Sequence, residues 1–306
     1  MQITVGNMTE FIENLKYRLE LKINGNEVGR VLHGRGGTFA EYNYLNVDYY
    51  PPALFITVFK DEDYSDLANI LIKEYGESHP IIVQERFEKI AKSISLGTQL
   101  PERHIVEEHG LKYQVNLKDN QNTGLFLDMR DERTSLMETS SGKNILNLFS
   151  YTCSLSVAAR SGGAKQVVNI DQKKTFLNIG RENHRINNLD DSVIYKSWDI
   201  LKSINQIGRL GPFDKIICDP PSNQGKSFFY KKDYQKIVRR MGEFLKVGGE
   251  FVACLNTPFE STSFLHELFH TEEGRWELVE ESFSSTEFEE LDKQKGLKMC
   301  TFRRVM

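Results

Sequence analysis

The sequence predicts a doubly wound α/β domain preceded by a smaller, strand-rich α+β domain. From about residue 111 onward, short apolar runs alternate with amphipathic segments of helical period, which is typical of parallel βαβ units. Residues before about 110 lack this alternation. We therefore expect two domains, residues 1–110 and residues 111–306, with a parallel sheet in the second.

Short strand patterns dominate the amino-terminal domain. Residues 19–23 alternate between apolar and polar side chains and lead into an Asn-Gly turn, so we expect a strand there. Further strands are expected near residues 29–31, 53–59 and 81–83, with a helix over residues 66–75. Residues 84–110 are expected to form a charged connection without a regular period.

The second domain is predicted from strands that alternate with helices along the chain. The expected strands are residues 144–149, 166–170, 192–196, 213–218 and 250–255, and the expected helices are residues 154–160, 173–187 and 233–246. A helix over residues 263–269 and two strands near residues 276–283 and 297–305 follow. This terminal pair of strands departs from a nicotinamide-binding domain and suits a methyltransferase sheet, whose last strand inserts antiparallel.

Composition excludes several classes of protein. A hydrophobic fraction of 39% in 306 residues supplies a sizeable core and excludes a disordered chain. The net charge of −4 gives no overall basic field, so any nucleic-acid contact has to be local. No run approaches the roughly 20 apolar residues of a membrane span, and the first residues lack a signal-peptide pattern.

The four cysteines, Cys153, Cys218, Cys254 and Cys300, are not at metal-ligand spacing. We therefore expect no metal site. Cys218 and Cys254 lie within apolar strand patterns, which favours core thiols in a reduced, cytoplasmic protein.

Asp219-Pro220-Pro221-Ser222 directly follows the predicted strand at residues 213–218. Two prolines fix φ and remove two backbone donors, so the turn is stiff. Such a turn can hold a carboxylate and free carbonyl oxygens against a flat polar ring, as in enzymes that methylate nitrogen on nucleobases or amides. The alternative is an ordinary loop in which Asp and Pro are turn formers.

Acidic residues also follow the second and third predicted strands of this domain. Asp171 follows the second strand, where a carboxylate can accept both ribose hydroxyls of a nucleoside. Asp199 follows the third strand and is placed to accept from an adenine amine. The chain contains no G-x-G-x-x-G, which favours a nucleoside without a diphosphate, such as S-adenosylmethionine (SAM), over NAD. The alternative role for either aspartate is a helix N-cap.

Three sequence blocks, residues 122–130, 147–152 and 219–222, resemble the SAM-dependent large-subunit ribosomal RNA methyltransferases, in their guanine-N7 branch and their related cytosine-C5 branch. The resemblance covers roughly residues 105–306 and implies SAM as cofactor, S-adenosylhomocysteine (SAH) as product and ribosomal RNA as partner. The expected cofactor-binding residues are Thr123, Phe126, Asp128, Arg130, Asn147, Phe149, Ser150, Tyr151, Thr152, Asp171, Gln172, Asp199, Ile200 and Asp219. The amino-terminal domain is then expected to position RNA.

Cys153 departs from the family pattern, because relatives usually have glycine at this place in the turn after Thr152. A Cβ there can narrow the approach of the cofactor or require a different backbone angle.

The acceptor atom is predicted from the fifth strand. Methylation of an aromatic carbon needs a covalent nucleophile, normally a thiolate. In the cytosine-C5 branch that this chain resembles, the nucleophilic cysteine follows the fifth strand. Aligned from Gly248-Gly249, its position holds Asn256 here, as in the guanine-N7 branch, and Cys254 lies two residues earlier, where core packing is favoured. We therefore expect guanine-N7 methylation, with Asp219, Pro220, Pro221 and Asn256 as the catalytic residues that hold the base.

Cations and aromatic side chains are interleaved after the Asp219 turn, which fits phosphate pairing and base stacking. The expected RNA-binding residues are Lys226, Phe229, Lys231, Lys232, Arg239 and Arg240. The alternative is a solvated helix face. Two other functions remain open: methylation of another planar nitrogen substrate (DNA, a protein amide or a small molecule), and a catalytically silent RNA-binding paralogue that retains SAM.

Overall fold

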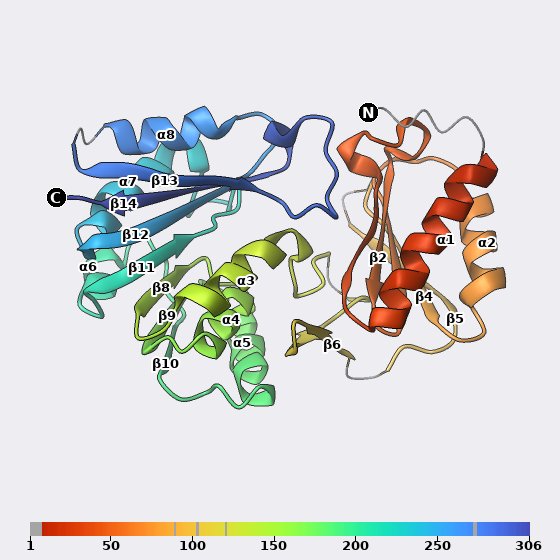
Figure 1. The fold of residues 1–306 in the computed structure, drawn as a ribbon, viewed down its shortest axis with the longest axis horizontal. Helices are drawn as coiled ribbons and strands as arrows, with labels where there is room; N and C mark the ends of the chain where they lie inside the picture. The colour runs from red at the N-terminus through yellow and green to blue at the C-terminus, as the bar shows by residue number, and fades with distance from the viewer. Residues whose placement is uncertain (1–7, 89, 102–103, 120, 272–273) are drawn as a thin grey trace. The chain divides into compact units, whose positions relative to one another are not determined.

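The computed structural model describes residues 8–88, 90–101, 104–119, 121–271 and 274–306. The chain forms two compact units (Figure 1): Met1–Asp128 with Ser285–Leu291, and Met129–Ser284 with Asp292–Met306. The expected division after residue 110 falls elsewhere. It would separate β6 (His104–Glu108) from β7 (Leu111–Val115), which pair as an antiparallel hairpin, so both strands stay in the first unit.

The second unit is built on a seven-stranded sheet, in the order β10-β9-β8-β11-β12-β14-β13. The strands are β8 (Asn144–Leu148), β9 (Gln166–Ile170), β10 (Val193–Lys196), β11 (Phe213–Cys218), β12 (Leu245–Asn256), β13 (Trp276–Phe283) and β14 (Leu297–Arg304). Strands β8 to β12 are parallel, and β14 inserts antiparallel between β12 and β13. This confirms the predicted doubly wound sheet and its antiparallel last strand.

Helices cover this sheet. They are α3 (Arg130–Thr139), α4 (Ser154–Ser161), α5 (Lys174–Ile186), α6 (Ile204–Gly208), α7 (Tyr230–Gly242) and α8 (Thr262–His270). Apolar side chains of α6, α7 and α8 form one core cluster with the strands, including Tyr234, Ile237 and Leu265. Helix α7 ends at Gly242 rather than at residue 246, because Leu245 already pairs with Phe213 of β11.

The first unit contains a five-stranded sheet in the order β1-β2-β3-β4-β5 and two longer helices. The elements are α1 (Met8–Gly25), β1 (Gly29–His33), β2 (Leu45–Tyr50), β3 (Ala53–Val58), α2 (Ser65–Tyr75), β4 (Pro80–Glu85) and β5 (Lys92–Gly97). Buried side chains from α1, α2 and the sheet form the core of this unit. The predicted helix over residues 66–75 is confirmed as α2.

Two expectations for the first unit are wrong. Residues 19–23 are the end of α1 and not a strand, because Phe11, Leu15 and Leu19 recur at helical spacing and are all buried. The connection over residues 84–110 contains β5, which pairs with β4. Strand β5 lies at the edge of the sheet and is mostly exposed or half-buried, so it carries no apolar run.

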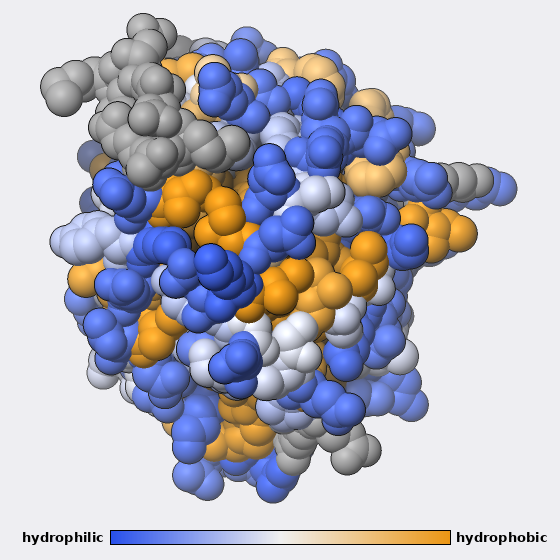
Figure 2. Space-filling view, turned by 90° about the vertical axis from the view of Figure 1, so that its right-hand side faces the viewer, coloured by the Kyte–Doolittle hydropathy of each residue, from blue (hydrophilic) through white to orange (hydrophobic). Residues whose placement is uncertain are grey.

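One face of the molecule (Figure 2) shows how polar and apolar side chains are distributed on the surface. Figure 2 shows the side at the right of Figure 1, where orange apolar patches lie among blue hydrophilic residues. Such patches are ordinary on folded proteins. Within the described ranges, no helix has the length and apolar character that a membrane span requires.

Candidate active site

The carboxyl ends of the five parallel strands lie at one edge of the sheet, where ligands bind in doubly wound folds. The expected residues that follow or end these strands are Phe149, Ser150, Tyr151 and Thr152 (β8), Asp171 and Gln172 (β9), Asp199 and Ile200 (β10), Asp219, Pro220 and Pro221 (β11), and Asn256 (β12). The strand order reverses between β8 and β11, which is the switch point of the sheet. The structure therefore gathers these residues along one edge.

Asp171 connects two of the loops at this edge. Its carboxylate accepts hydrogen bonds from the backbone N–H of Tyr151 (3.0 Å) and of Lys173 (2.8 Å). The side chain is largely buried, and this burial raises the pKa of Asp171, while the two N–H donors act in the opposite direction. A carboxylate has about four lone-pair directions, so these two bonds leave acceptor capacity for a ligand.

The turn after β8 has an unusual backbone. Phe149, Tyr151 and Cys153 all have positive φ, which L-residues rarely adopt. Cys153 has φ +62° at the start of α4, where glycine would be unstrained. Its sulfur is fully buried against Gly180 of α5, and a Cβ on Gly180 would overlap with it. The side chain of Cys153 is thus accommodated by the absence of one on Gly180.

Gln172 is bonded to two neighbouring loops. Its backbone carbonyl accepts from Ser197 Oγ (2.9 Å), and its side-chain Oε1 accepts from Ser227 Oγ (3.3 Å). These bonds connect the loops after β9, β10 and β11. Asp199 accepts from the backbone N–H of Lys202 (3.2 Å), so it supports the turn that follows β10.

Tyr234 of α7 stabilises the start of the Asp219 loop through hydrogen bonds. The Tyr234 hydroxyl donates to the carbonyl oxygens of Cys218 (2.9 Å) and Cys254 (3.1 Å), in a bond shared between β11 and β12. Further along the same loop, Ser222 Oγ donates to the carbonyl oxygen of Asn256 (3.4 Å). The turn and the end of β12 are therefore held side by side.

Cys254 lies in the interior, whereas Asn256 reaches the surface. Cys254 is fully buried in β12, and burial raises the pKa of its thiol well above the usual range. Asn256 is the last residue of β12 and is exposed. The thiol is therefore protonated at neutral pH and remote from solvent, which opposes a nucleophilic role.

Asn147 has a structural environment that the sequence did not indicate. Its side-chain amide donates to Asn169 (3.0 Å), which in turn donates to Ser156 (2.9 Å). Ser156 is bonded to His184 (2.9 Å), and Asn147, Asn169, Ser156 and His184 are all buried. This polar network joins β8, β9, α4 and α5, so the side chain of Asn147 fixes the base of the site.

The expected cofactor-binding residues in the block at residues 122–130 are divided between the two units. Thr123, Phe126 and Asp128 belong to the first unit, and Arg130 begins α3 in the second. Within the first unit, Thr123 Oγ1 is bonded to the Tyr50 hydroxyl (2.9 Å). Their expected contact with the cofactor stays a prediction.

The expected RNA-binding residues differ in their local bonding. Lys231 pairs with Glu260 (2.5 Å), and Arg240 donates to Asn205 (2.8 Å). The side chains of Lys226, Lys232 and Arg239 are exposed and form no hydrogen bond or ion pair with any residue in the described ranges. Phe229 is 42% exposed.

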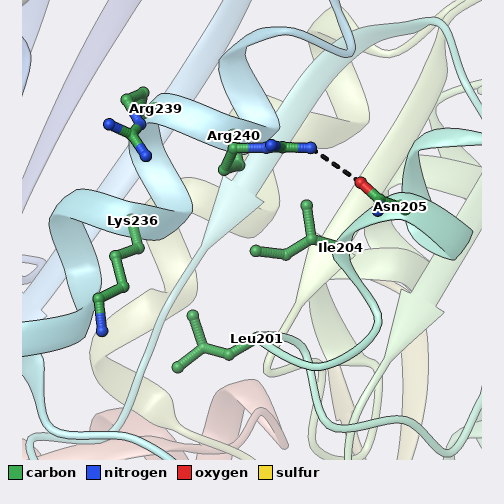
Figure 3. A pocket seen from close by; sticks show the side chains of 6 residues that line it. All are labelled: Leu201, Ile204, Asn205, Lys236, Arg239 and Arg240. Carbon is green, nitrogen blue, oxygen red and sulfur yellow. Dashed lines mark hydrogen bonds between the residues drawn. The ribbon is translucent and has the colours of Figure 1, made fainter.

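Helices α6 and α7 border a pocket of about 440 Å³ (Figure 3). Its lining residues are Leu201, Ile204, Asn205, Lys236, Arg239 and Arg240. Lys236 is bonded to Asp233 (2.9 Å), and in Figure 3 Arg240 is directed toward Asn205. This surface combines two aliphatic side chains with three cations and is suited to anionic ligands.

Some residues of this edge could not be found from sequence patterns. Ser197, Ser227 and Tyr234 hold the loops together through single hydroxyl groups, which have no periodicity or motif to reveal them. Among the described residues, no group of three or more His, Cys, Asp and Glu side chains is arranged to hold a metal ion.

Comparison with known proteins identifies relatives by sequence. The profile of the S-adenosylmethionine-dependent methyltransferase family (Methyltrans_SAM) matches residues 29–303. Ribosomal RNA large subunit methyltransferase K/L of Shewanella loihica is 38% identical over 158 residues, which are 50% of this chain and 22% of that protein. Ribosomal RNA large subunit methyltransferase I of Aeromonas salmonicida is 39% identical over 119 residues, 38% of this chain and 30% of that protein. The chain thus spans less than a third of these two curated relatives.

A solved structure agrees over nearly the whole chain. SMU.776, described as a methyltransferase complexed with SAH, has a TM-score of 0.86 at 25% identity and covers 97% of this chain and 82% of its own. The agreement includes the smaller first unit as well as the doubly wound sheet.

Proposed function

Since the chain belongs to the S-adenosylmethionine-dependent methyltransferase family, we propose that it transfers a methyl group to a base nitrogen of ribosomal RNA, with guanine N7 as the favoured acceptor. The observation that carries this proposal is the Asp219 turn, held beside the exposed Asn256 at the same sheet edge as Asp171. The names of the two curated relatives support ribosomal RNA as the substrate class.

The side chains at the sheet edge fit a SAM-type nucleoside. Asp171 retains acceptor capacity beyond its two backbone donors, as ribose hydroxyls require, and Asp199 supplies a second carboxylate acceptor for an adenine amine. SAM supplies an electrophilic methyl group on a sulfonium. We propose that Asp171 and Asp199 orient the nucleoside, and that the turn at residues 149–152 forms the wall against which it lies.

Guanine N7 carries a lone pair and no proton, so its methylation requires positioning rather than a general base. In the proposed arrangement, the Asp219 carboxylate accepts from the donors on the Watson–Crick edge of guanine. The exposed amide of Asn256 donates to O6, which lies beside N7. The prolines keep the carboxylate fixed, and the Tyr234 hydroxyl anchors the two strand ends.

Methyl transfer from labelled SAM to total RNA tests this function. The Asp219→Ala variant should lose about 10²-fold in kcat/KM, because the base is no longer positioned. Asp190→Asn is the matched control. Asp190 is exposed and precedes the amino end of β10, whereas Asp219 follows the carboxyl end of β11. Nucleoside mass spectrometry should find the label on 7-methylguanosine. Label on DNA or protein alone, or no transfer by the parent, would contradict the proposal.

Carbon methylation is distinguished by Cys254. Cys254→Ala should cost some stability, because the thiol is fully buried, and should leave turnover within about tenfold, because no covalent step is expected. Denaturing electrophoresis of reaction mixtures checks for a protein–RNA adduct. An adduct that disappears in Cys254→Ala would replace the nitrogen assignment with carbon chemistry.

We also propose that the enzyme works in the cytosol. Its four cysteines are free and buried, and core thiols persist in reducing compartments. Thiol titration of the denatured protein, purified under air-free conditions, should detect all four.

A further inference from the structure

Phe259 is 82% exposed, more than any other large apolar side chain in the described ranges. It lies in the loop between Asn256, which ends β12, and Thr262, which begins α8. A single exposed apolar side chain needs no special explanation. The hydrogen bonds and the ion pair that fix this loop, however, are suited to a binding role for the exposed ring.

The loop that carries Phe259 is fixed at both ends. Before Phe259, the ammonium of Lys298, which is fully buried, donates to the carbonyl oxygens of Thr257 (2.8 Å), Gln294 (2.7 Å) and Gly296 (2.8 Å). All three of its donors are thereby used, and one of them secures the loop.

After Phe259, Glu260 accepts from the Tyr230 hydroxyl (3.2 Å) and pairs with Lys231 (2.5 Å). Both partners belong to the first turn of α7. The phenyl ring therefore lies on a loop whose backbone is ordered before any ligand arrives, which lowers the entropic cost of binding.

This loop adjoins the proposed catalytic turn. Ser222 of that turn donates to the carbonyl of Asn256 (3.4 Å), three positions before Phe259. The turn itself, Asp219-Pro220-Pro221-Ser222, contains no aromatic ring. Phe229, 42% exposed, packs edge-on against Tyr230 (5.4 Å between centroids), and Tyr230 is bonded to Glu260 of the loop. Two exposed rings are thus carried by connected segments next to the site.

We propose that Phe259 is a substrate-binding residue that stacks on the nucleobase flanking the methylated base in single-stranded RNA. This inference rests on the proposed function. A base extruded for methylation leaves its neighbour unstacked, and an aromatic platform compensates for the lost stacking without reading the sequence. Phe259 is far more exposed than the half-buried Asp219, so its ring contacts the nucleotide that stays outside the site.

The test compares Phe259→Ala and Phe259→Trp with Val247→Ala in the full-length protein. Val247 is 66% exposed and lies near the amino end of β12, so it is an apolar control remote from the strand's carboxyl end. Phe259→Ala should raise KM for RNA about 5- to 150-fold with kcat nearly unchanged, and Phe259→Trp should restore KM. The salt dependence of RNA binding should not change, because the ring contacts no phosphate. Val247→Ala should behave as the parent.

Calorimetry with SAH and thermal unfolding complete the experiment. Unchanged SAH affinity and melting temperature in Phe259→Ala are expected, and a loss of either would assign the ring a structural role and overturn the inference. A parental KM in Phe259→Ala, or no rescue by Trp, would also overturn it.

If the parent transfers no methyl group to RNA, the proposed function fails. Filter binding of RNA by the same variants then still decides whether Phe259 contacts the substrate.

Discussion

At the scale of single residues, the hydrogen bonds of Asp171 bear on the two roles that its position in the sequence suggested. Its place after the second strand predicted a ribose acceptor, with helix capping as the alternative. In the structure the carboxylate accepts from Lys173 at the start of α5 and from Tyr151 of the neighbouring loop. The bond to Lys173 is cap-like, whereas the bond to Tyr151 is a tertiary contact that spacing alone could not predict.

Asp171→Ala should weaken binding of SAH by about 1–3 kcal/mol, the cost of leaving polar partners unpaired. Asp171→Asn should fall between Ala and the parent, because it keeps one acceptor oxygen. Isothermal titration calorimetry measures the affinities, and thermal unfolding separates loss of binding from loss of the loop. Unchanged affinity in Asp171→Ala would remove the ribose assignment.

Glu132 is a buried carboxyl group that no sequence pattern marks. It lies in the first turn of α3 and is 8% exposed, and its Oε1 has no hydrogen-bond partner among the described residues. Burial raises the pKa of Glu132 to about 7, against a partial compensation by Lys215. The folded state therefore holds this proton more tightly than the unfolded state does.

The stability linked to Glu132 should be fully present below the unfolded-state pKa of 4.5 and lost as pH rises through about 7. Glu132→Gln mimics the protonated form. It should be more stable than the parent at pH 8 by roughly 3 kcal/mol, with the difference disappearing near pH 4. Urea unfolding across this pH range measures the effect. Parallel pH profiles for the parent and the variant would contradict it.

At the scale of elements, the sequence predicted most strands and helices of the second unit, where a buried face has a clear period. The strands from β8 to β12 and the helix α5 lie close to their expected positions, because apolar runs and helical spacing mark them. The edge strand β5 and helix α3 were not predicted. Strand β5 is largely exposed, and α3 buries the charged Glu132 and Arg133 beside Leu136, which hides its apolar stripe.

The expected RNA-binding cations on helix α7 differ in whether their charge is paired with a carboxylate. The charge of Lys231 is paired with Glu260, whereas Lys232 and Arg239 are exposed without such pairing among the described residues. An ion-paired lysine releases fewer counterions on binding RNA. The unpaired cations should therefore dominate the salt dependence.

Lys232→Glu and Arg239→Glu should each flatten the slope of log affinity against log salt by about 0.7, if each contacts one phosphate of single-stranded RNA. Lys231→Ala should change the slope less, and Lys165→Glu, an exposed lysine before β9, should leave it unchanged. Filter binding across salt concentrations measures the slopes. Parental slopes in both reversals would assign these charges to solubility and move the RNA path to the first unit.

At the scale of the whole molecule, one segment departs from the order of the chain. Residues Ser285–Leu291, which we call the acidic strap, join β13 and β14 of the second unit but belong to the first. Within the first unit, Glu287 pairs with Lys22, Glu289 pairs with Arg18 and Glu290 pairs with His33. No local pattern predicts such a crossing, because it depends on contacts between residues more than 250 positions apart.

At Gly36 the backbone of the strap lies close to the backbone of another segment of the first unit. The N–H of Leu291 donates to the carbonyl of Gly36 (2.9 Å), and a Cβ on Gly36 would overlap with the carbonyl oxygen of Glu289. Gly36→Ala should therefore displace the strap, at the roughly 1–3 kcal/mol cost of overpacking. Limited proteolysis should then cleave residues 285–291 about 5- to 150-fold faster, since cleavage follows the population of the open form.

Gly25→Ala is the matched control, because Gly25 also lies in the first unit and an added Cβ there meets nothing within 4 Å. It should be cleaved at the parental rate. Loss of the strap frees the connection between β13 and β14, so thermal unfolding of Gly36→Ala should resolve separate transitions for the two cores. Equal cleavage of Gly36→Ala and Gly25→Ala would mean that the ion pairs of Glu287, Glu289 and Glu290 hold the strap without the close backbone contact.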